Sequence, residues 1–480
     1  MTIFSKGFIL FVALISSSCF AEQKQPTVVV IGAGLAGLTT AFRLQQKGVD
    51  VHLYEARNRV GGRVFSAQVG NSISELGGQN ITDGGAAENI RRLIDEFHLE
   101  LAENRFGLAH SYFDGKTLIP GHVLYKTKFD PEMLKELLSQ VAQKSRNMRE
   151  VLDTLLENQD PLYRTLSVRL AAYEGAAIEK LSPLYAETLY HMLMGGICSV
   201  HQSADEDGNY VDLVSIKGGN AMLPKELARS LGDKVHLNMP LVAVSKALDH
   251  SYELLFLDGE KITTDILVLA IPCSVYCDIL FEKNLIPEET LESIPSVQYG
   301  TNGKILVPFS SPPLKRVALL NDRIVGFMNA DHSVFTLYYT GEAGRFSADT
   351  ILKAYLQERP LLESGFGDLC PPVSIPVFAR DESLASYEGP VGYSWPNDPY
   401  VKGSYAYIAP GQEVLLTATQ TEDEEQVKTL FAPIGQSLYF AGEHASILLY
   451  VPGTMEAACE SGERTARMIL NAMRHNEAPY

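Results

Sequence analysis

The hydrophobic pattern near the start of the chain predicts a strand–helix–strand unit. Residues 27–31 form a continuous, mostly β-branched run, which is typical of a strand buried on both faces of a parallel sheet. Apolar residues then recur at helical spacing over 35–44, and Gly48 ends this helix before a second apolar strand at 51–54. The unit has the minimal size of a βαβ crossover.

Further along, the pattern becomes helical and then strand-like. Between about 87 and 196 there are two helical stripes, one at Ile90, Leu93, Ile94 and Phe97 and one at Met133, Leu137, Leu138 and Val141. Two strands at 252–257 and 261–271 are joined by Asp258-Gly259, a strong hairpin signal. Further strands are expected at 334–339 and 437–441, and a terminal helix has apolar positions at 455, 459, 462, 466, 469 and 473. The two ends of the chain therefore suggest one discontinuous domain interleaved with another.

Length and composition are those of a large globular chain. With 480 residues, 46% apolar and 20% charged, two or three folding units with a substantial core are expected. The net charge of −18 does not indicate a phosphate-binding basic surface, so nucleic acid is not an expected partner. A negative field slightly favours the approach of cationic small molecules.

The six cysteines are scattered, without a CxxC pair or a histidine at zinc-ligand spacing. We therefore expect no metal site and no disulfide framework. Most of the cysteines are expected to be buried free thiols, although Cys273 and Cys277 are close enough in sequence for a local pairing.

The first residues are typical of an export signal. Lys6 precedes an apolar run over 7–15, and small residues lead to a cleavage site after Ala21. The run is shorter than the ~20 apolar residues of a membrane-spanning helix, and we expect no transmembrane anchor later in the chain. We predict that residues 1–21 are a signal peptide and that the protein is periplasmic or secreted. Lipidation of Cys19 is the alternative to cleavage after Ala21.

A glycine-rich motif directly follows the first strand. In the spacing of Gly32, Gly34 and Gly37, the first glycine permits a tight turn, the second admits a pyrophosphate and the third packs helix on strand. The helix N-terminus presents free N–H groups and a positive dipole end to phosphates. Glu55 closes the second strand, where a carboxylate can accept the hydroxyls of an adenosine ribose. Together these features predict a dinucleotide site.

The segment after Glu55 indicates a flavin rather than a nicotinamide dinucleotide. It carries Gly61 and Gly62 between Arg59 and Arg63. The glycines allow close backbone approach, and the arginines place cationic groups near the pyrophosphate. Elsewhere such a segment would be a solvated basic loop, but here it follows the ribose-binding acid directly.

These motifs resemble the flavin-containing amine oxidase family, which includes monoamine oxidases, polyamine oxidases and L-amino acid oxidases. The similar segments follow the family's order over nearly the whole chain, at 28–44, 55–63, 74–79, 267–272, 303–309, 395–405, 438–444 and 453–466. The resemblance implies an α/β fold in which a Rossmann-like FAD-binding domain is interleaved with an α+β substrate domain. The FAD-binding domain would comprise 24–88, 212–284 and 404–472, and the substrate domain 89–211 and 285–403.

The resemblance also implies which residues hold FAD. The expected contacts are Gly32, Gly34, Leu35, Ala36, Gly37, Glu55, Ala56, Arg57, Gly62, Arg63, Leu241, Gly442, Glu443, Thr454 and Met455. The last helix would begin near Thr454 and direct its positive end to the flavin, where reduction places negative charge. Ser404 stands where monoamine oxidases carry the cysteine that binds flavin covalently, so non-covalent FAD is expected.

Three residues match family positions beside the flavin and the substrate. Lys304 matches the lysine that holds a water next to flavin N5, and Trp395 and Tyr405 match aromatic positions of the site. In several amine oxidases a second aromatic completes a cage around the substrate nitrogen. Thr454 stands at that position here, so only half of the cage is retained.

The resemblance implies oxidative deamination of a small-molecule amine to imine and aldehyde, with oxygen as electron acceptor and ammonia and hydrogen peroxide as products. Gln79 and Asn80 stand where L-amino acid oxidases place a carboxylate-binding arginine, which favours an amine without an α-carboxylate. An L-amino acid oxidase stays open as an alternative if Arg91 or Arg92 binds the substrate carboxylate instead. A flavin desaturase or protoporphyrinogen-like oxidase and a flavoprotein without turnover are further alternatives. No oligomeric state follows from the sequence.

Overall fold

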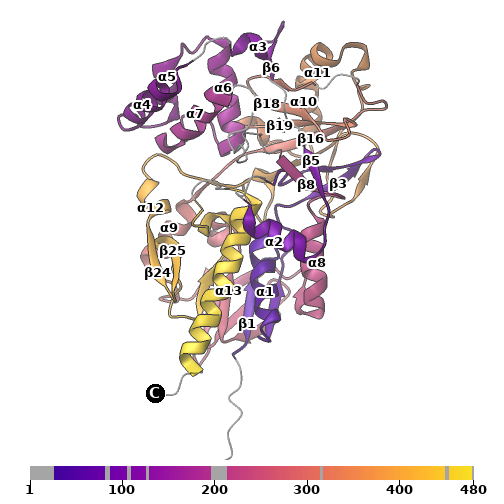
Figure 1. The fold of residues 1–480 in the computed structure, drawn as a ribbon. Helices are drawn as coiled ribbons and strands as arrows, with labels where there is room; N and C mark the ends of the chain where they lie inside the picture. Colours follow the sequence, from indigo (N-terminus) through magenta and orange to yellow (C-terminus); the bar gives the residue numbers. More distant parts are fainter. Residues whose placement is uncertain are drawn as a thin grey trace, which may run out of the picture.

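The computed structural model describes residues 26–81, 87–104, 110–125, 129–195, 213–313, 317–448 and 453–477. Residues 1–21 lie outside this described part, so the signal peptide stays a prediction, and lipidation of Cys19 stays its alternative. In Figure 1 the described chain forms a lower part around β1, α1 and α13 and an upper part that contains α4 to α7, α10 and α11.

A five-stranded parallel sheet forms the centre of the lower part. Its order is β26 (Leu438–Phe440), β13 (Ile266–Leu269), β1 (Val28–Ile31), β2 (Val51–Tyr54) and β9 (Val235–His236). The strands predicted at 27–31, 51–54 and 437–441 agree with β1, β2 and β26 to within a residue at each end. The sheet joins strands from the beginning, the middle and the end of the chain, as the predicted α/β fold requires.

Both faces of β1 are covered, which explains its uninterrupted run of apolar residues. Val28 and Val30 pack with the helices α1 (Leu35–Gln46), α8 (Met222–Leu231) and α13 (Met455–Glu477). Val29 and Ile31 pack on the other side, against residues of a second sheet. Alternate side chains of β1 thus pack in two separate hydrophobic cores.

Helices α1 and α13 lie side by side although they stand at opposite ends of the chain (Figure 1). A Cβ atom at Gly462 would lie 2.5 Å from the carbonyl oxygen of Ala36, so the helices approach closely only because this position is glycine. The predicted apolar stripe of the terminal helix is confirmed, since Met455, Cys459 and Ile469 are all buried.

The second sheet contains the predicted hairpin. Its order is β12 (Lys261–Thr264), β11 (Tyr252–Phe256), β10 (Leu241–Lys246) and β14 (Leu280–Phe281). β11 and β12 pair antiparallel around the predicted turn, where Gly259 has φ +91°. The prediction of one strand over 261–271 is wrong, because the chain leaves this sheet after Thr264 and continues as β13 of the central sheet. Strand-favouring residues continue across the change of sheet, so the local pattern does not show it.

An eight-stranded sheet forms the centre of the upper part. Its order is β20 (Val377–Phe378), β22 (Val391–Ser394), β16 (Gly303–Pro308), β19 (Val334–Tyr339), β18 (Ile324–Met328), β17 (Leu319–Leu320), β6 (Ser111–Phe113) and β7 (Leu118–Ile119). In β16, Ile305 and Val307 pack with α10 (Ile351–Gln357) and α11 (Arg359–Phe366). Leu306 points the other way and packs in a cluster with Ala67 and Val69 of β3 (Ser66–Val69) and with Leu76, which follows β4 (Ser72–Glu75). This second face of β16 is therefore directed toward the lower part.

Four helices, α4 (Pro131–Ala142), α5 (Met148–Leu155), α6 (Pro161–Glu174) and α7 (Ala186–Gly195), share one core beside this sheet. The stripe predicted for α4 is partly wrong. Leu134 and Leu138 are each 2% exposed, whereas Met133 is 70% and Leu137 39% exposed. Residues four apart lie on one helical face, and α4 buries only the narrow face that contains these two leucines.

Helix α2 (Glu88–Glu96) packs with residues of the lower part. It begins at the predicted boundary of the substrate domain, yet Ile90, Leu93 and Ile94 are buried with α1 and α13 in the lower part. The helical prediction for 87–196 also missed β5 (Leu101–Asn104), β6 and β7. β5 pairs with β8 (Leu213–Ile216) and β6 with β17, and such long-range pairing leaves no mark in local periodicity. The domain boundaries stay predictions.

A buried acid ends helix α6. Glu174 is 6% exposed and accepts a hydrogen bond from Thr188 Oγ1 at 2.6 Å. Burial raises the pKa of Glu174 to about 7, although the Thr188 hydrogen bond opposes this shift. Among the described residues, no cationic side chain forms an ion pair with it.

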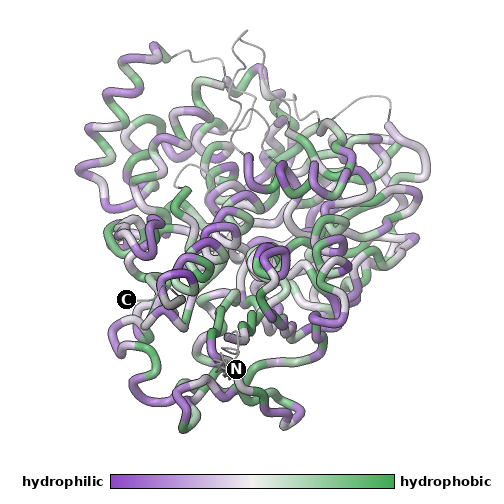
Figure 2. The backbone as a smooth tube through the Cα atoms, turned by 60° about the horizontal axis from the view of Figure 1, so that its bottom comes forward, coloured by the Kyte–Doolittle hydropathy of each residue, from purple (hydrophilic) through white to green (hydrophobic). Residues whose placement is uncertain are grey.

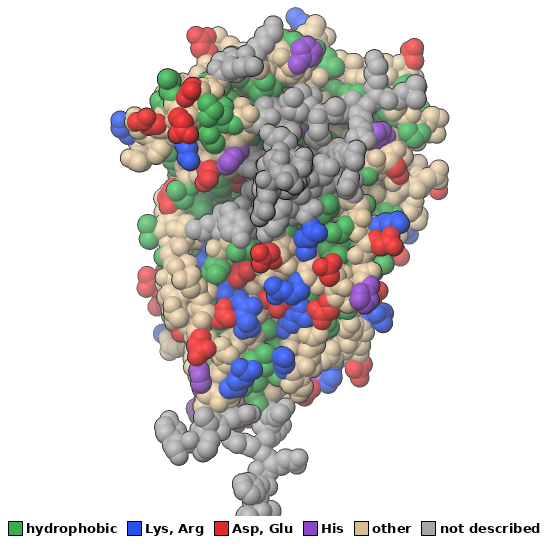
Figure 3. Space-filling view, in the orientation of Figure 1, with side chains coloured by type: hydrophobic (Ala, Val, Ile, Leu, Met, Phe, Trp, Pro, Cys, Tyr) green, Lys and Arg blue, Asp and Glu red, His purple; other side chains and the backbone are tan. Residues whose placement is uncertain are grey.

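The surface of the described residues mixes polar and apolar positions. Along the outer helices of Figure 2, hydrophobic and hydrophilic positions alternate, and none of the described helices has the length and apolarity to cross a membrane. On the face shown in Figure 3, acidic and basic side chains are interspersed. Cys273 and Cys277 are free, so the local pairing is not formed, and the described part of the chain contains no cluster of three metal-ligating side chains.

Candidate active site

The glycines after β1 leave open space at the N-terminus of α1. Gly32 has φ +104°, and a Cβ atom there would lie 2.5 Å from the carbonyl oxygen of Ala270. A Cβ at Gly37 would lie 2.0 Å from the carbonyl oxygen of Gly32. A Cβ at Gly34 would meet nothing within 4 Å, so the packing of the protein itself does not require glycine there. This space lies where the free N–H groups of Leu35 and its neighbours attract an anion.

Glu55 is held at the end of β2 by backbone groups. Its carboxylate accepts hydrogen bonds from the N–H groups of Ala33 at 2.7 Å and Arg57 at 2.9 Å. Burial raises its pKa, and these two bonds oppose the shift. Each carboxylate oxygen has a second lone pair, so Glu55 can still accept hydrogen bonds from ribose hydroxyls. The half-buried Leu241, which starts β10, stands two residues after Met239, whose N–H donates to the carbonyl oxygen of Glu55.

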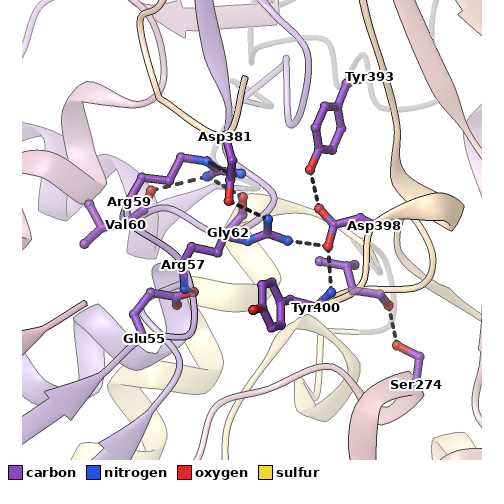
Figure 4. Close-up of polar contacts among 11 residues, drawn as sticks. Glu55, Arg57, Arg59, Val60, Gly62, Ser274, Asp381, Tyr393, Asp398 and Tyr400 are labelled. Atoms are coloured by element: carbon purple, nitrogen blue, oxygen red, sulfur yellow. Dashed lines mark hydrogen bonds and ion pairs between the residues drawn. The ribbon is translucent and has the colours of Figure 1, made fainter. Parts of the chain in front are cut away.

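The side chain of Arg57 points to Asp381 and Asp398 (Figure 4). It forms ion pairs with Asp381 at 3.1 Å and with the fully buried Asp398. Arg59 contacts the same Asp381 at 2.7 Å and donates to the carbonyl oxygen of Gly62 at 2.9 Å. These guanidinium groups connect the motif to residues 381–398, and the predicted cofactor contacts of Ala56 and Arg57 stay predictions.

Arg63 and Glu443 form a second connection. Arg63 lies 2.7 Å from Glu443 Oε1 and donates to the carbonyl oxygen of Ser404 at 3.0 Å. Glu443 Oε2 and Ser404 Oγ are buried and have no hydrogen-bond partner among the described residues. Gly442, at φ +151°, places Glu443 directly after β26. Unpartnered buried oxygens are costly, and the hydroxyls of a bound cofactor can satisfy them.

The N-terminus of α13 is a further part of the candidate site. Thr454 Oγ1 accepts a hydrogen bond from the N–H of Ala457 at 3.2 Å, which is the geometry of an N-cap. Met455 is buried, and a Cβ at Gly78 would lie 3.2 Å from its side chain. The start of this long helix therefore lies against the segment that contains Gly77 and Gly78.

Lys304 lies on the face of β16 that is directed toward this segment. It is 5% exposed, and its Nζ donates to the carbonyl oxygens of Glu75 at 3.1 Å and Gly77 at 2.8 Å and to Gln79 Oε1 at 2.8 Å. Three acceptors suit an ammonium group. Burial nevertheless lowers the pKa of Lys304 to about 7, while the nearby Glu75 carboxylate opposes the shift. Burial thus favours the neutral amine, whereas the three oxygen acceptors and the Glu75 carboxylate favour the ammonium group.

Tyr405 stands next to the start of α13. A Cβ at Gly453 would lie 2.8 Å from Cδ2 of its ring, and a Cβ at Gly175 would lie 2.9 Å from the neighbouring Cε2. Its hydroxyl donates to the carbonyl oxygen of Ala172, at 2.7 Å, near the C-terminal end of α6. Lys304 and Tyr405 are thereby brought together from distant parts of the chain, with Tyr338 between them.

Trp395 occupies a different place from the other two predicted residues. It is 5% exposed, its Nε1 donates to the carbonyl oxygen of Leu76 at 3.0 Å, and its ring packs edge-on against Tyr393 at 4.8 Å. Leu76 lies between the two carbonyl groups that accept from Lys304. Trp395 therefore supports the Lys304 segment from behind, and its contact with flavin or substrate stays a prediction.

Sequence reasoning missed Asn302, Tyr338, Glu75 and Asp398, which surround the predicted residues. Asn302 could have been found, because it stands two positions before Lys304 and so shares its strand face. Nothing local points to Tyr338, because its place opposite Lys304 depends on the register between β16 and β19.

These residues fit FAD. Open space lies at the helix N-terminus behind Gly34, Glu55 has spare acceptor capacity, and buried oxygens of Ser404 and Glu443 lack partners. A nucleotide-binding βαβ unit that leads to a buried lysine and an aromatic wall defines a flavin-dependent oxidoreductase.

The family model described as "Flavin containing amine oxidoreductase" matches residues 35–470. The chain belongs to this family, and its cofactor is FAD. Ser404 has no thiol to form a thioether, so the cofactor is held non-covalently.

Individual relatives are similar over nearly the whole chain. Flavin-containing amine oxidase B from Homo sapiens is 27% identical over 93% of this chain and 86% of its own length. Cyclohexylamine oxidase from Brevibacterium oxydans IH-35A matches in structure with a TM-score of 0.68 and 19% identity, over 95% of this chain and 100% of that one. Putrescine oxidase bound to putrescine matches with a TM-score of 0.68 and 19% identity, over 93% and 99%. The two structures confirm the predicted fold.

Proposed function

We propose that this amine oxidoreductase acts on primary amines without an α-carboxylate. Amine, oxygen and water give aldehyde, ammonia and hydrogen peroxide: the amine carbon loses two electrons, and oxygen gains them. FAD, when bound, supplies the electron-accepting ring between the two half-reactions. The protein supplies binding, orientation and proton positions.

The observation that carries this proposal is the buried Lys304 beside Tyr405 at the start of α13. Lys304 Nζ is directed by three oxygen acceptors, and burial lowers its pKa to about 7. In its neutral form Nζ keeps two N–H donors and gains a lone pair, which can accept a hydrogen bond from a water molecule or take up a proton. The positive end of α13 stabilises negative charge at the same place, and the Tyr405 ring offers a rigid apolar wall for a neutral amine.

The polar side chains around Lys304 and Tyr405 support an amine rather than an amino acid. Within the described residues, those that hydrogen-bond to this pair are Gln79, Asn302 and Tyr338, and none is an arginine. Arg92, one of the two candidates for a carboxylate clamp, is exposed on α2. The names of the human relative and of the cyclohexylamine oxidase also favour simple amines.

The test is a substrate screen with two readouts. Purified yellow holoprotein is mixed with monoamines, diamines, polyamines and L-amino acids, and flavin bleaching is followed anaerobically while peroxide is followed in air. We expect bleaching and peroxide with amines. Reduction by L-amino acids alone would identify an amino acid oxidase. Bleaching without peroxide would exclude oxygen as the acceptor, and a yellow protein that no compound bleaches would contradict catalysis.

We further propose that the protein is exported and loses residues 1–21. The support is the sequence of the first residues: a lysine, an apolar run and small residues before Ala21. Fractionation of producing cells and N-terminal sequencing test this, with Glu22 expected as the first residue of the mature chain. A chain that keeps its leader, or that carries lipid on Cys19, would contradict cleavage after Ala21.

A further inference from the structure

Asn302 is a buried polar residue in the candidate site that has no assigned role. It is fully buried and immediately precedes β16. Because side chains alternate along a strand, it shares the face of Lys304 and not that of Ile305. The register of β16 and β19 places Tyr338 opposite Lys304 on this face. Asn302, Lys304 and Tyr338 therefore point to the same region.

The amide of Asn302 connects two tyrosine hydroxyls. Its Nδ2 donates to the hydroxyl of Tyr338 at 2.6 Å and to that of Tyr405 at 2.9 Å. The two hydroxyl oxygens lie 3.3 Å apart. Both N–H groups of the amide are thus used, while Oδ1 is buried and has no partner among the described residues.

The donor character of Asn302 sets the direction of the Tyr405 hydroxyl. Since this hydroxyl accepts from Asn302, its own proton is free for the carbonyl oxygens of Ala172 at 2.7 Å and Tyr173 at 3.0 Å. These carbonyl groups belong to the last turn of α6. The hydroxyl therefore ties β16 to the end of α6.

The ring of Tyr405 has little freedom in this arrangement. Gly175 and Gly453 both lie against its Cδ2–Cε2 edge, so closely that a Cβ at either position would lie within 3 Å of a ring carbon. Packing limits the tilt of the ring, and the hydroxyl contacts limit its rotation and displacement. Side chains fixed in this way hold a substrate wall in one geometry.

We propose that Asn302 is a positioning residue that fixes Tyr405 against the end of α6 and so sets the orientation of the substrate amine. The inference rests on the proposed function, in which the Tyr405 ring is the substrate wall. A hydrophobic residue of the same size at position 302 would fill the space but hold neither hydroxyl. An aspartate would accept instead of donate and would draw the Tyr405 proton away from Ala172.

The experiment is a double-mutant cycle on the holoprotein. Asn302→Leu, Tyr405→Phe and the double variant are compared by anaerobic stopped-flow reduction with the best amine of the screen, which separates amine binding from the reduction rate. Misplacement of a substrate wall can cost about 10- to 100-fold in reduction rate, and we expect a loss in this range for Asn302→Leu at unchanged FAD content. In the Tyr405→Phe background, the same change should cost less than about twofold, because the hydroxyl is already absent.

A buried asparagine outside the site is the control. Asn321 is 7% exposed and donates to Glu358 Oε2 at 2.6 Å; Asn321→Leu should lower stability without changing amine binding or the reduction rate. Wild-type kinetics for Asn302→Leu, or losses that multiply in the double variant, would overturn the positioning role while leaving the proposed function intact. If Asn302→Leu does not accumulate, Asn302→Ser takes its place under the same criteria. A wild-type protein that no amine reduces would overturn both.

Discussion

Removal of the Asp398 carboxylate tests the connection between the nucleotide motif and the segment that carries Trp395 and Tyr405. Asp398 has a fully buried side chain. Its oxygens accept from the Arg57 guanidinium, the Tyr393 hydroxyl and the N–H of Tyr400, the last at 2.8 Å (Figure 4). Asp398→Ala removes all three acceptor contacts at once, whereas Asp398→Asn keeps the shape and one oxygen.

The structure sets the size of the effect. Breaking a buried ion pair by removing one partner costs about 3–5 kcal/mol, because the other charge stays buried. Arg57 is 4% exposed but keeps Asp381 as a partner, which favours the lower end of that range. The unpaired Tyr393 hydroxyl adds about 1–3 kcal/mol as a buried donor without a partner. We expect a loss of about 4 kcal/mol for Asp398→Ala and about half of that for Asp398→Asn.

The assay is urea unfolding of the holoprotein, followed by FAD fluorescence and by circular dichroism. Asp398→Ala should release FAD at a lower urea concentration than Asp398→Asn, and both at a lower one than the wild type. The matched change Asp278→Ala, at the exposed pair of Lys402 and Asp278, which are 42% and 48% exposed, should cost less than about 1 kcal/mol. An Asp398→Ala protein with the wild-type midpoint would refute the argument that this pair connects the two parts.

Three further predictions concern the site and the core. Lys304→Met should slow flavin reduction by at least about tenfold at unchanged FAD content. The control Lys353→Met, at an exposed lysine, should leave the reduction rate unchanged. Equal reduction rates for the two variants would exclude a function for Lys304 in the reaction. Gly34→Ala should fold normally and lose FAD, because its Cβ enters only the open space assigned to the cofactor, whereas Gly37→Ala, with a Cβ 2.0 Å from a carbonyl oxygen, should fail to fold. FAD content and circular dichroism distinguish the two variants. A yellow Gly34→Ala protein would contradict the assignment of this space to FAD. Burial raises the pKa of Glu174 to about 7, so the folded state binds more protons than the unfolded state between about pH 4.5 and 7. The free energy of unfolding therefore falls as the pH rises through that window. Glu174→Gln should therefore gain about 3 kcal/mol over the wild type near pH 8 and little near pH 4.5, and thermal unfolding at both pH values checks this.

The sequence predicted the nucleotide end of the site well, because its requirements are local. Gly32, Gly34 and Gly37 follow one strand directly, and Glu55 ends the next. The turn, the helix N-terminus and the strand are consecutive elements, so spacing along the chain is also spacing in the structure. The side chain of Arg57 is the exception, since its partners Asp381 and Asp398 stand more than 300 residues away.

The catalytic end was predicted only through the family resemblance and only in part. Tyr338 lies between Lys304 and Tyr405, Trp395 supports the Lys304 segment, and the predicted roles of these three site residues stay predictions. Asn302 and Tyr338 appear only in the structure. Which side chains face each other across a sheet depends on strand register, and a shift of one residue exchanges its two faces.

By itself, the sequence determined the α/β class, the dinucleotide motif, the buried parallel strands and the membership of the amine oxidoreductase family, because each is encoded in consecutive residues. Only the tertiary structure decided that helix α2 belongs with α1 and α13, that one predicted strand is two strands of different sheets, and that Asn302 holds two tyrosines. Pairings between distant segments are selected by the packing of the whole chain, so they become visible only where the segments meet.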